Sequence, residues 1–151
     1  MTSPESGATV RRVSDHFDLV VIGGGPGGYS AALYGASAGM NVALVEMDAL
    51  GGTCLNRGCI PAKAFLETAA VKRHVDHAGD FGIEGSGEAK VNFARTQERK
   101  QGIVNGLVKG IGAMCKGRKV EVFNGTGSLA ANRTVSVAMA DGSSATITGD
   151  A

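Results

Sequence analysis

The first part of the chain alternates between apolar runs and small residues. Asp18–Ile22 (DLVVI) predicts a short strand buried on both faces, because every residue after the aspartate is apolar. Tyr29–Ala38 is rich in alanine and predicts a helix that stops at Gly39, and Asn41–Glu46 (NVALVE) predicts a second strand. This order is a βαβ unit, whose two strands we expect to pair in parallel.

Two helices are predicted in the middle of the chain. The first covers about residues 61–78, and a glycine-rich polar loop follows over residues 79–89. The second covers residues 93–115, with these apolar residues at helical spacing: Ile103, Val104, Leu107, Val108, Ile111, Met114 and Cys115. Gly102, Gly106 and Gly110 fall four apart on this helix, which also carries basic residues. We therefore expect a close-packing face of a water-soluble helix.

The last part of the chain alternates with period two. The apolar members of this pattern are Val120, Val122, Val135, Val137, Met139, Ala145 and Ile147. Asp141-Gly142 is typical of a hairpin turn, so three or four antiparallel strands are expected. The predicted fold class is therefore α/β, a parallel sheet joined to a small antiparallel meander. We expect one unit over residues 17–151, preceded by a polar, disordered tail over residues 1–16.

Composition excludes several classes of protein. The 151 residues carry a formal net charge of +1, so a generally basic nucleic-acid-binding protein is not indicated. Apolar residues make up 43% of the chain, enough for a packed core, yet no apolar run is long enough to cross a bilayer. The N-terminal segment lacks the apolar stretch of a secretory signal, so a cytoplasmic location is expected.

The glycine run after the first predicted strand has the spacing of a dinucleotide-binding loop. Gly23, Gly25 and Gly28 satisfy G-x-G-x-x-G directly after a strand and before a helix, and Glu46 ends the next strand. The first glycine permits the tight turn, the second lets the backbone approach a pyrophosphate, and the third lets the helix pack on the strand. The helix N-terminus offers free N–H groups to phosphates.

Glu46 is suited to hydrogen-bonding a ribose diol and would repel a 2′-phosphate, which disfavours NADP. The alternative is a nucleotide-free turn of an α/β protein. The loop alone does not distinguish FAD from NAD.

Three cysteines are present, too few for a disulfide-stapled secreted domain. Cys54 and Cys59 lie close together and indicate redox chemistry or a metal site. A zinc site would need two more ligands, for which His74 and His77 are the candidates, although such a pair on a polar helix face is more often solvated surface. Cys115 belongs to the apolar face of the second helix and is expected to be a small buried hydrophobe.

The redox interpretation is the stronger one. Cys59 lies just before Ile60-Pro61, where a helix is expected to begin, and a helix N-terminus stabilises a thiolate. A stabilised thiolate is a good leaving group in thiol–disulfide exchange and a suitable electron donor to a flavin. The pair is also close to the predicted dinucleotide loop.

Residues 51–63, GGTCLNRGCIPAK, resemble the active-disulfide motif of the class I pyridine nucleotide-disulfide oxidoreductases. The motif is specific, because it fixes many positions at once. Leu55-Asn56 followed by residues 58–61 is most similar to the branch that oxidises dihydrolipoamide. Ala62 departs from it, since serine is usual there. The resemblance covers about residues 17–150 and implies a Rossmann-like FAD-binding domain.

The resemblance also implies a role for individual residues. It places five residues around the FAD pyrophosphate: Gly23, Gly25, Pro26, Gly27 and Gly28. It places Glu46 on the adenosine ribose and a backbone contact of Gly127 at the adenine. It places Gly52, Thr53 and Lys63 against the flavin half, with the Lys63 ammonium near the ring. Cys54 and Cys59 would form the redox disulfide, with Cys59 next to the flavin and Cys54 meeting the substrate.

The implied reaction is oxidation of dihydrolipoamide, free or on a lipoyl domain, with electrons passing through the disulfide and FAD to NAD⁺. The family continues well past residue 151 with an NAD-binding domain and a homodimer-forming domain that supplies a His–Glu pair. We therefore expect a fragment that is inactive alone and has an open sheet edge. A disulfide reductase acting on glutathione or mercuric ion, or a non-enzymatic flavin-binding fragment, is the alternative.

The segment from Phe93 to Lys119 carries seven basic residues and one acid, Glu98. A solvated helix face is the simpler interpretation. A docking surface for an acidic partner domain is the alternative.

Overall fold

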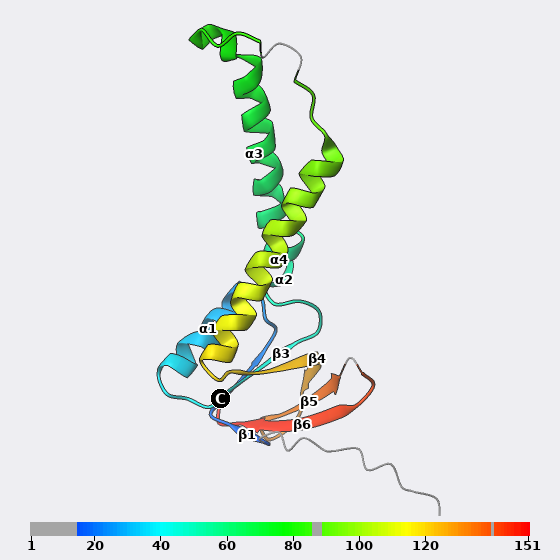
Figure 1. The fold of residues 1–151 in the computed structure, drawn as a ribbon. Helices are drawn as coiled ribbons and strands as arrows, with labels where there is room; N and C mark the ends of the chain where they lie inside the picture. The colour runs from blue at the N-terminus through cyan, green and yellow to red at the C-terminus, as the bar shows by residue number, and fades with distance from the viewer. Residues whose placement is uncertain (1–14, 86–88, 140) are drawn as a thin grey trace, which may run out of the picture.

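The computed structural model describes residues 15–85, 89–139 and 141–151 (Figure 1). Most of the segment expected to be a disordered tail, residues 1–16, lies outside the described residues. Its last residue, His16, begins strand β1 (His16–Phe17), which pairs in parallel with β6 (Ser144–Gly149).

The other strands are β2 (Leu19–Ile22), β3 (Val42–Glu46), β4 (Glu121–Leu129) and β5 (Thr134–Met139). The helices are α1 (Pro26–Ser37), α2 (Gly52–Asn56), α3 (Cys59–Asp76), the 3-10 helix η1 (Ala78–Phe81) and α4 (Phe93–Gly117). Each predicted helix and strand is therefore confirmed, with ends shifted by a few residues. Three short elements were not predicted, namely α2, η1 and β1.

The strands form a six-stranded sheet in the order β1-β6-β5-β4-β3-β2. β2, β3 and the first half of β4 are parallel, whereas β4, β5 and β6 form an antiparallel meander. The α/β fold class is confirmed. One detail differs from the prediction, because β4 belongs to both parts: residues 121–124 pair with β3 and residues 125–129 pair with β5.

Gly125 stands where β4 changes partner. A Cβ atom at Gly125 would collide with the carbonyl oxygen of Ala138 on β5. The absence of a side chain therefore lets the meander turn tightly across the end of the parallel sheet.

β3 lies at the centre of the core and is buried along its whole length. Val42 and Leu44 pack on one side with residues of α1 and α4, and Ala43 and Val45 pack on the other side with the meander. On that second side, Phe17 and Phe123 meet edge to face with ring centroids 6.0 Å apart. Figure 1 shows α1 and the C-terminal half of α4 beside the sheet, which curls round through β4–β6.

β2 is not buried on both faces, contrary to the prediction. Its four residues are half-buried or exposed, and Ile22 is 47% exposed. The reason is its place in the sheet, where β2 is the last strand and has β3 as its neighbour. On the side of β2 away from β3, the Val20 amide donates a hydrogen bond to the carbonyl oxygen of Ala151 at 2.9 Å.

α3 and α4 form a long helical hairpin that projects away from the sheet (Figure 1). The rings of Phe65 and Phe93 stack between these two helices, with centroids 5.8 Å apart. The predicted close-packing face of α4 is wrong, because a Cβ atom at Gly102, Gly106 or Gly110 would find no neighbour within 4 Å. Within the described ranges, no helix combines the length and the apolar character needed to span a membrane.

Candidate functional site

The glycine run forms the turn from β2 to α1. Gly23 has a φ of +99°, a conformation that glycine adopts without strain, and its amide bonds to the carbonyl oxygen of Val45 at 2.7 Å. α1 begins at Pro26, which is followed by Gly27 and Gly28, and no side chain caps its N-terminus. No acidic residue lies in its first turn, so this helix end is free to attract an anion.

The glycines of this turn differ in what surrounds them. A Cβ atom at Gly28 would collide with the carbonyl oxygen of Gly23, so the close approach of α1 to the turn requires glycine there. A Cβ atom at Gly25 or Gly27 would meet no atom within 4 Å. The space over these two residues is therefore open, as access of a pyrophosphate to the backbone requires.

Glu46 lies at the end of β3, 8% exposed, and organises two loops. Its Oε2 accepts a hydrogen bond from the Gly24 amide at 2.6 Å, and its Oε1 accepts one from the Asp48 amide at 2.8 Å. A carboxylate has about four lone-pair positions, so both oxygens keep capacity for the hydroxyls of a ribose.

A cavity of about 250 Å³ brings three of the predicted residues together. Gly23, Glu46 and Gly127 line it along with Ile22, Val45, Met47, Gly125 and Thr126. Gly127 lies on β4 with its Cα close to the side chains of Val45 and Ile22, so a side chain there would crowd both. The cavity lies where three parallel strands end, at the carboxyl edge on which α/β sheets bind ligands.

The segment that carries the cysteines rests directly on the glycine turn. The Gly51 amide donates to the carbonyl oxygen of Gly24 at 2.8 Å. Gly52, with a φ of +58°, lies so close that a Cβ atom there would be 2.8 Å from the Cα of Gly25. Thr53 follows on α2 with an exposed side chain.

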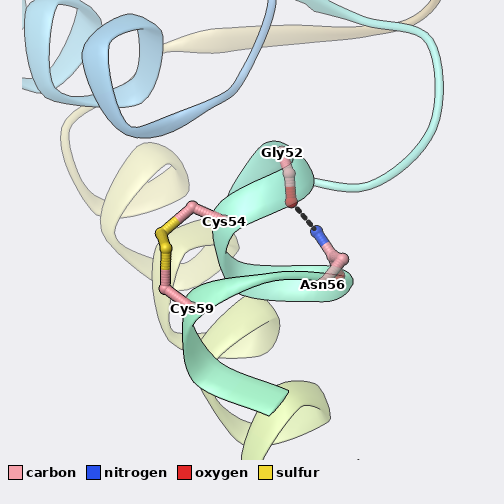
Figure 2. The surroundings of a disulfide bond; sticks show 4 residues. All are labelled: Gly52, Cys54, Asn56 and Cys59. Carbon is pink, nitrogen blue, oxygen red and sulfur yellow. Dashed lines mark hydrogen bonds between the residues drawn. A yellow bond between two sulfur atoms is a disulfide. The ribbon is translucent and has the colours of Figure 1, made fainter. Parts of the chain in front are cut away.

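Cys54 on α2 and Cys59, the first residue of α3, are joined by a disulfide with a Cα–Cα distance of 4.8 Å (Figure 2). The expected pairing is present, and the helix predicted to begin near Cys59 does begin there. Cys54 is half-buried and Cys59 is exposed. A reduced Cys59 would therefore lie at a helix N-terminus, where the backbone dipoles favour a thiolate.

A second cavity, of about 360 Å³, opens beside Cys54 and not beside Cys59. Its walls come from the start of α1, the cysteine segment and α4: Pro26, Tyr29, Gly51, Leu55, Ile60, Gly106, Leu107, Gly110, Ile111 and Met114. Most of these residues are apolar. Two of the α4 glycines that pack against no neighbour, Gly106 and Gly110, border this space.

Asn56, the last residue of α2, has a role that was not predicted. Its side-chain amide donates to the carbonyl oxygens of Leu50 at 3.1 Å and Gly52 at 3.0 Å, and reaches that of Ala49 at 3.4 Å. The sequence places an asparagine between the two cysteines, but nothing in its spacing indicates which carbonyl groups it reaches. Gly24 and Gly51 were likewise left out of the predicted site.

Two other predicted positions lie apart from these contacts. Lys63 lies one turn along α3 from Cys59, is exposed, and lines neither cavity. Cys115 is fully buried in the core cluster with α1 and β3, as expected, and burial raises the pKa of its thiol while nearby Arg118 opposes the shift.

The zinc alternative receives no support from the geometry. Cys54 bonds to Cys59, and among residues 15–85, 89–139 and 141–151 no three histidine, cysteine or acidic side chains gather as metal ligands.

Comparison with known proteins agrees with this arrangement. The family model described as pyridine nucleotide-disulphide oxidoreductase matches residues 17–151. A dihydrolipoyl dehydrogenase of Acholeplasma laidlawii is 41% identical over 145 residues, which are 89% of this chain and 43% of that protein. One from Bacillus subtilis is 46% identical over 116 residues, 76% of this chain and 25% of that protein.

The solved structure of LpdA from Mycobacterium tuberculosis has the same fold, with a TM-score of 0.78 at 24% identity. The superposition covers 91% of this chain and 30% of LpdA. The chain thus spans 25% to 43% of the length of the two relatives named above. With the family model matched over nearly the whole sequence and the cysteine pair joined beside a dinucleotide-type turn, the chain belongs to the pyridine nucleotide-disulphide oxidoreductases.

Proposed function

We propose that the chain is the FAD-binding and redox-disulfide part of a dihydrolipoyl dehydrogenase. In the whole protein, dihydrolipoamide would be oxidised, and its electrons would pass through the Cys54–Cys59 disulfide and FAD to NAD⁺. The contact between the Gly51 amide and the Gly24 carbonyl carries this proposal, because it fixes the disulfide segment beside a turn suited to a dinucleotide.

The residues present fit FAD. The open backbone at Gly25 and Gly27 and the uncapped start of α1 suit its pyrophosphate, with Gly23, Pro26 and Gly28 shaping the turn. Glu46 and the backbone of Gly127 line a cavity that suits the adenosine end. Gly52, Thr53 and Lys63 would face the flavin half. When bound, FAD accepts two electrons from a dithiol and passes them to NAD⁺ as hydride.

The two cysteines would act by thiol–disulfide exchange. One thiolate of dihydrolipoamide attacks the Cys54 sulfur, the Cys54–Cys59 bond breaks, and Cys59 leaves as a thiolate. The second substrate thiol then attacks the mixed disulfide, which releases the Cys54 thiol and the oxidised cyclic disulfide. The start of α3 would stabilise the leaving Cys59 thiolate, which supports Cys59 as the sulfur that donates to the flavin.

The cavity beside Cys54 supports the assignment of Cys54, and not Cys59, as the sulfur that the substrate attacks. It is mainly apolar and reaches Cys54 from the side of α4, so an aliphatic dithiol could approach that sulfur. A substrate such as glutathione carries more charge and suits these walls less well. That difference favours dihydrolipoamide over the glutathione-type alternative.

The chain spans 43% and 25% of the length of the two relatives named above. We propose that the NAD site, the His–Glu acid–base pair and the homodimer contacts lie outside these residues, and that the chain alone does not turn over. The cytoplasm is the compartment that we propose for the whole protein.

Single cysteine substitutions test the roles of the two sulfurs. With FAD bound, Cys54→Ser leaves the Cys59 thiolate next to the oxidised flavin, and a long-wavelength charge-transfer absorbance is expected without any reductant. Cys59→Ser should lack this band, and Cys115→Ala, which keeps the disulfide, should also lack it until reduced. A band in Cys59→Ser instead would reverse the assignment. Failure of every variant and of the parent chain to bind FAD would reject the proposal.

A further inference from the structure

Building on the proposed function, we propose that Asn56 is a positioning residue for the redox disulfide. Its side-chain amide holds the turn that carries Cys54 against the glycine turn, and so sets where the disulfide lies relative to the proposed flavin site. Figure 2 shows Asn56 across the helical turn from the two sulfur atoms, with a hydrogen bond to Gly52 and none to a cysteine. Asn56 therefore acts through the backbone and is not a catalytic residue.

The chemistry of the contact requires a donor. Three carbonyl oxygens surround the amide nitrogen of Asn56: those of Ala49, Leu50 and Gly52. Carbonyl oxygens only accept hydrogen bonds, so the group facing them must be an NH₂ and not an amide oxygen. An ionised aspartate has nearly the same shape as asparagine, but its two carboxylate oxygens only accept hydrogen bonds and carry a negative charge. It would therefore have no donor for the three carbonyl oxygens.

The segment that Asn56 holds is the one that touches the glycine turn. Leu50 packs on Gly24, the Gly51 amide bonds to the carbonyl oxygen of Gly24, and Gly52 lies against the Cα of Gly25. The Leu50 contact is made by its side chain, and the contacts of Gly51 and Gly52 are made by backbone atoms. Asn56 thus bonds to the residues on both sides of Gly51.

Asn56 also lies between the two cysteines in the sequence. It follows Cys54 by two residues on α2, and it precedes Gly58, the residue before the start of α3. A shift of residues 49–52 would move α2 and Cys54 with it, while Cys59 stays anchored on α3. Loss of the Asn56 contacts should therefore change the geometry of the pair as well as its distance from the glycine turn.

The test uses the whole 151-residue chain and begins without FAD. Hydrogen–deuterium exchange at the Gly51 amide reports the bond to Gly24, and equilibration with dithiothreitol reports the disulfide potential. In Asn56→Asp we expect Gly51 exchange to speed up by about tenfold or more, as loss of a hydrogen bond to a buried partner implies. We also expect a shifted disulfide equilibrium and weaker FAD binding. Asn105→Asp on exposed α4, which keeps its acceptor for Gln101, is the matched control and should resemble the parent chain.

A pH series separates the hydrogen bond from simple packing. Below about pH 4 the new carboxyl group in Asn56→Asp is protonated and regains one O–H donor, so its Gly51 exchange should approach that of the parent chain. Asn56→Ala should show faster exchange with no such recovery. It also serves if the aspartate variant fails to fold, because it removes the donors without adding a charge.

The outcomes separate this inference from the proposed function. Parent-like Gly51 exchange and disulfide equilibrium in both Asn56 variants would overturn the positioning role, even if the parent chain binds FAD. If the parent chain does not bind FAD but both readouts still respond to Asn56, the proposed flavin function fails while the positioning of the disulfide turn stands.

Discussion

The Gly51 amide and the Gly24 carbonyl oxygen, 2.8 Å apart, join the cysteine segment to the glycine turn. The amide of the same Gly24 donates to Oε2 of Glu46 at 2.6 Å, so one residue, Gly24, links the end of β3, the turn and the redox segment. A structural change in any one of these three parts should therefore alter the structure of the other two.

The first prediction concerns the close approach of α1 to the turn. Gly28→Ala places a Cβ atom against the carbonyl oxygen of Gly23, which forces the helix away. We expect the free energy of unfolding to fall by about 1–3 kcal/mol, the usual cost of overpacking, in urea titrations of the chain without FAD. Gly27→Ala is the control, because its Cβ atom meets open space and alanine favours a helix. Equal stability of both variants would refute the steric account.

The second prediction concerns Glu46. Both of its oxygens accept backbone hydrogen bonds, so Glu46→Gln turns one acceptor into an NH₂ that faces an N–H group. The free energy of unfolding, measured by urea titration, is expected to fall by about 1–3 kcal/mol, because the site is buried. Glu67→Gln on the exposed side of α3 should change stability by less than about 0.5 kcal/mol. A Glu46→Gln chain as stable as the parent would show that these bonds contribute little.

The third prediction is a pH dependence that arises at Cys115. Burial raises the pKa of this thiol above its ordinary value of 9.0, so the unfolded chain loses the proton first as the pH rises. The resulting contribution to stability is complete below pH 9 and is lost as the pH passes through the raised pKa of the folded state. From pH 7 to pH 10, the urea concentration at the unfolding midpoint should therefore fall further in the parent chain than in Cys115→Ala. Equal falls in the two proteins would argue against a buried thiol.

Much of the fold follows from local patterns. The βαβ unit was predictable because DLVVI, the glycine run and NVALVE each specify one element, and the period-two pattern after Val120 specified the meander. The partial exposure of β2 and the change of pairing partner along β4 were not predictable. Which strand ends a sheet, and where a strand changes partner at Gly125, depends on the assembled sheet and not on its own residues.

The candidate site shows the same division. Gly23, Glu46, Cys54 and Cys59 could be predicted as site residues because their side chains, or the lack of one, stand at a diagnostic spacing. The Gly51–Gly24 bond was missed because backbone groups are the same at every residue and leave no mark in a sequence. Asn56 was missed for a related reason, since its partners are three carbonyl oxygens.

The most direct test of the proposed function is the visible absorbance of the 151-residue chain mixed with FAD, before and after dihydrolipoamide is added. We expect a protein-bound flavin spectrum and, on reduction, a long-wavelength band from the Cys59 thiolate. A chain that remains colourless after FAD is added and the excess removed would contradict the claim that these residues form a flavin site.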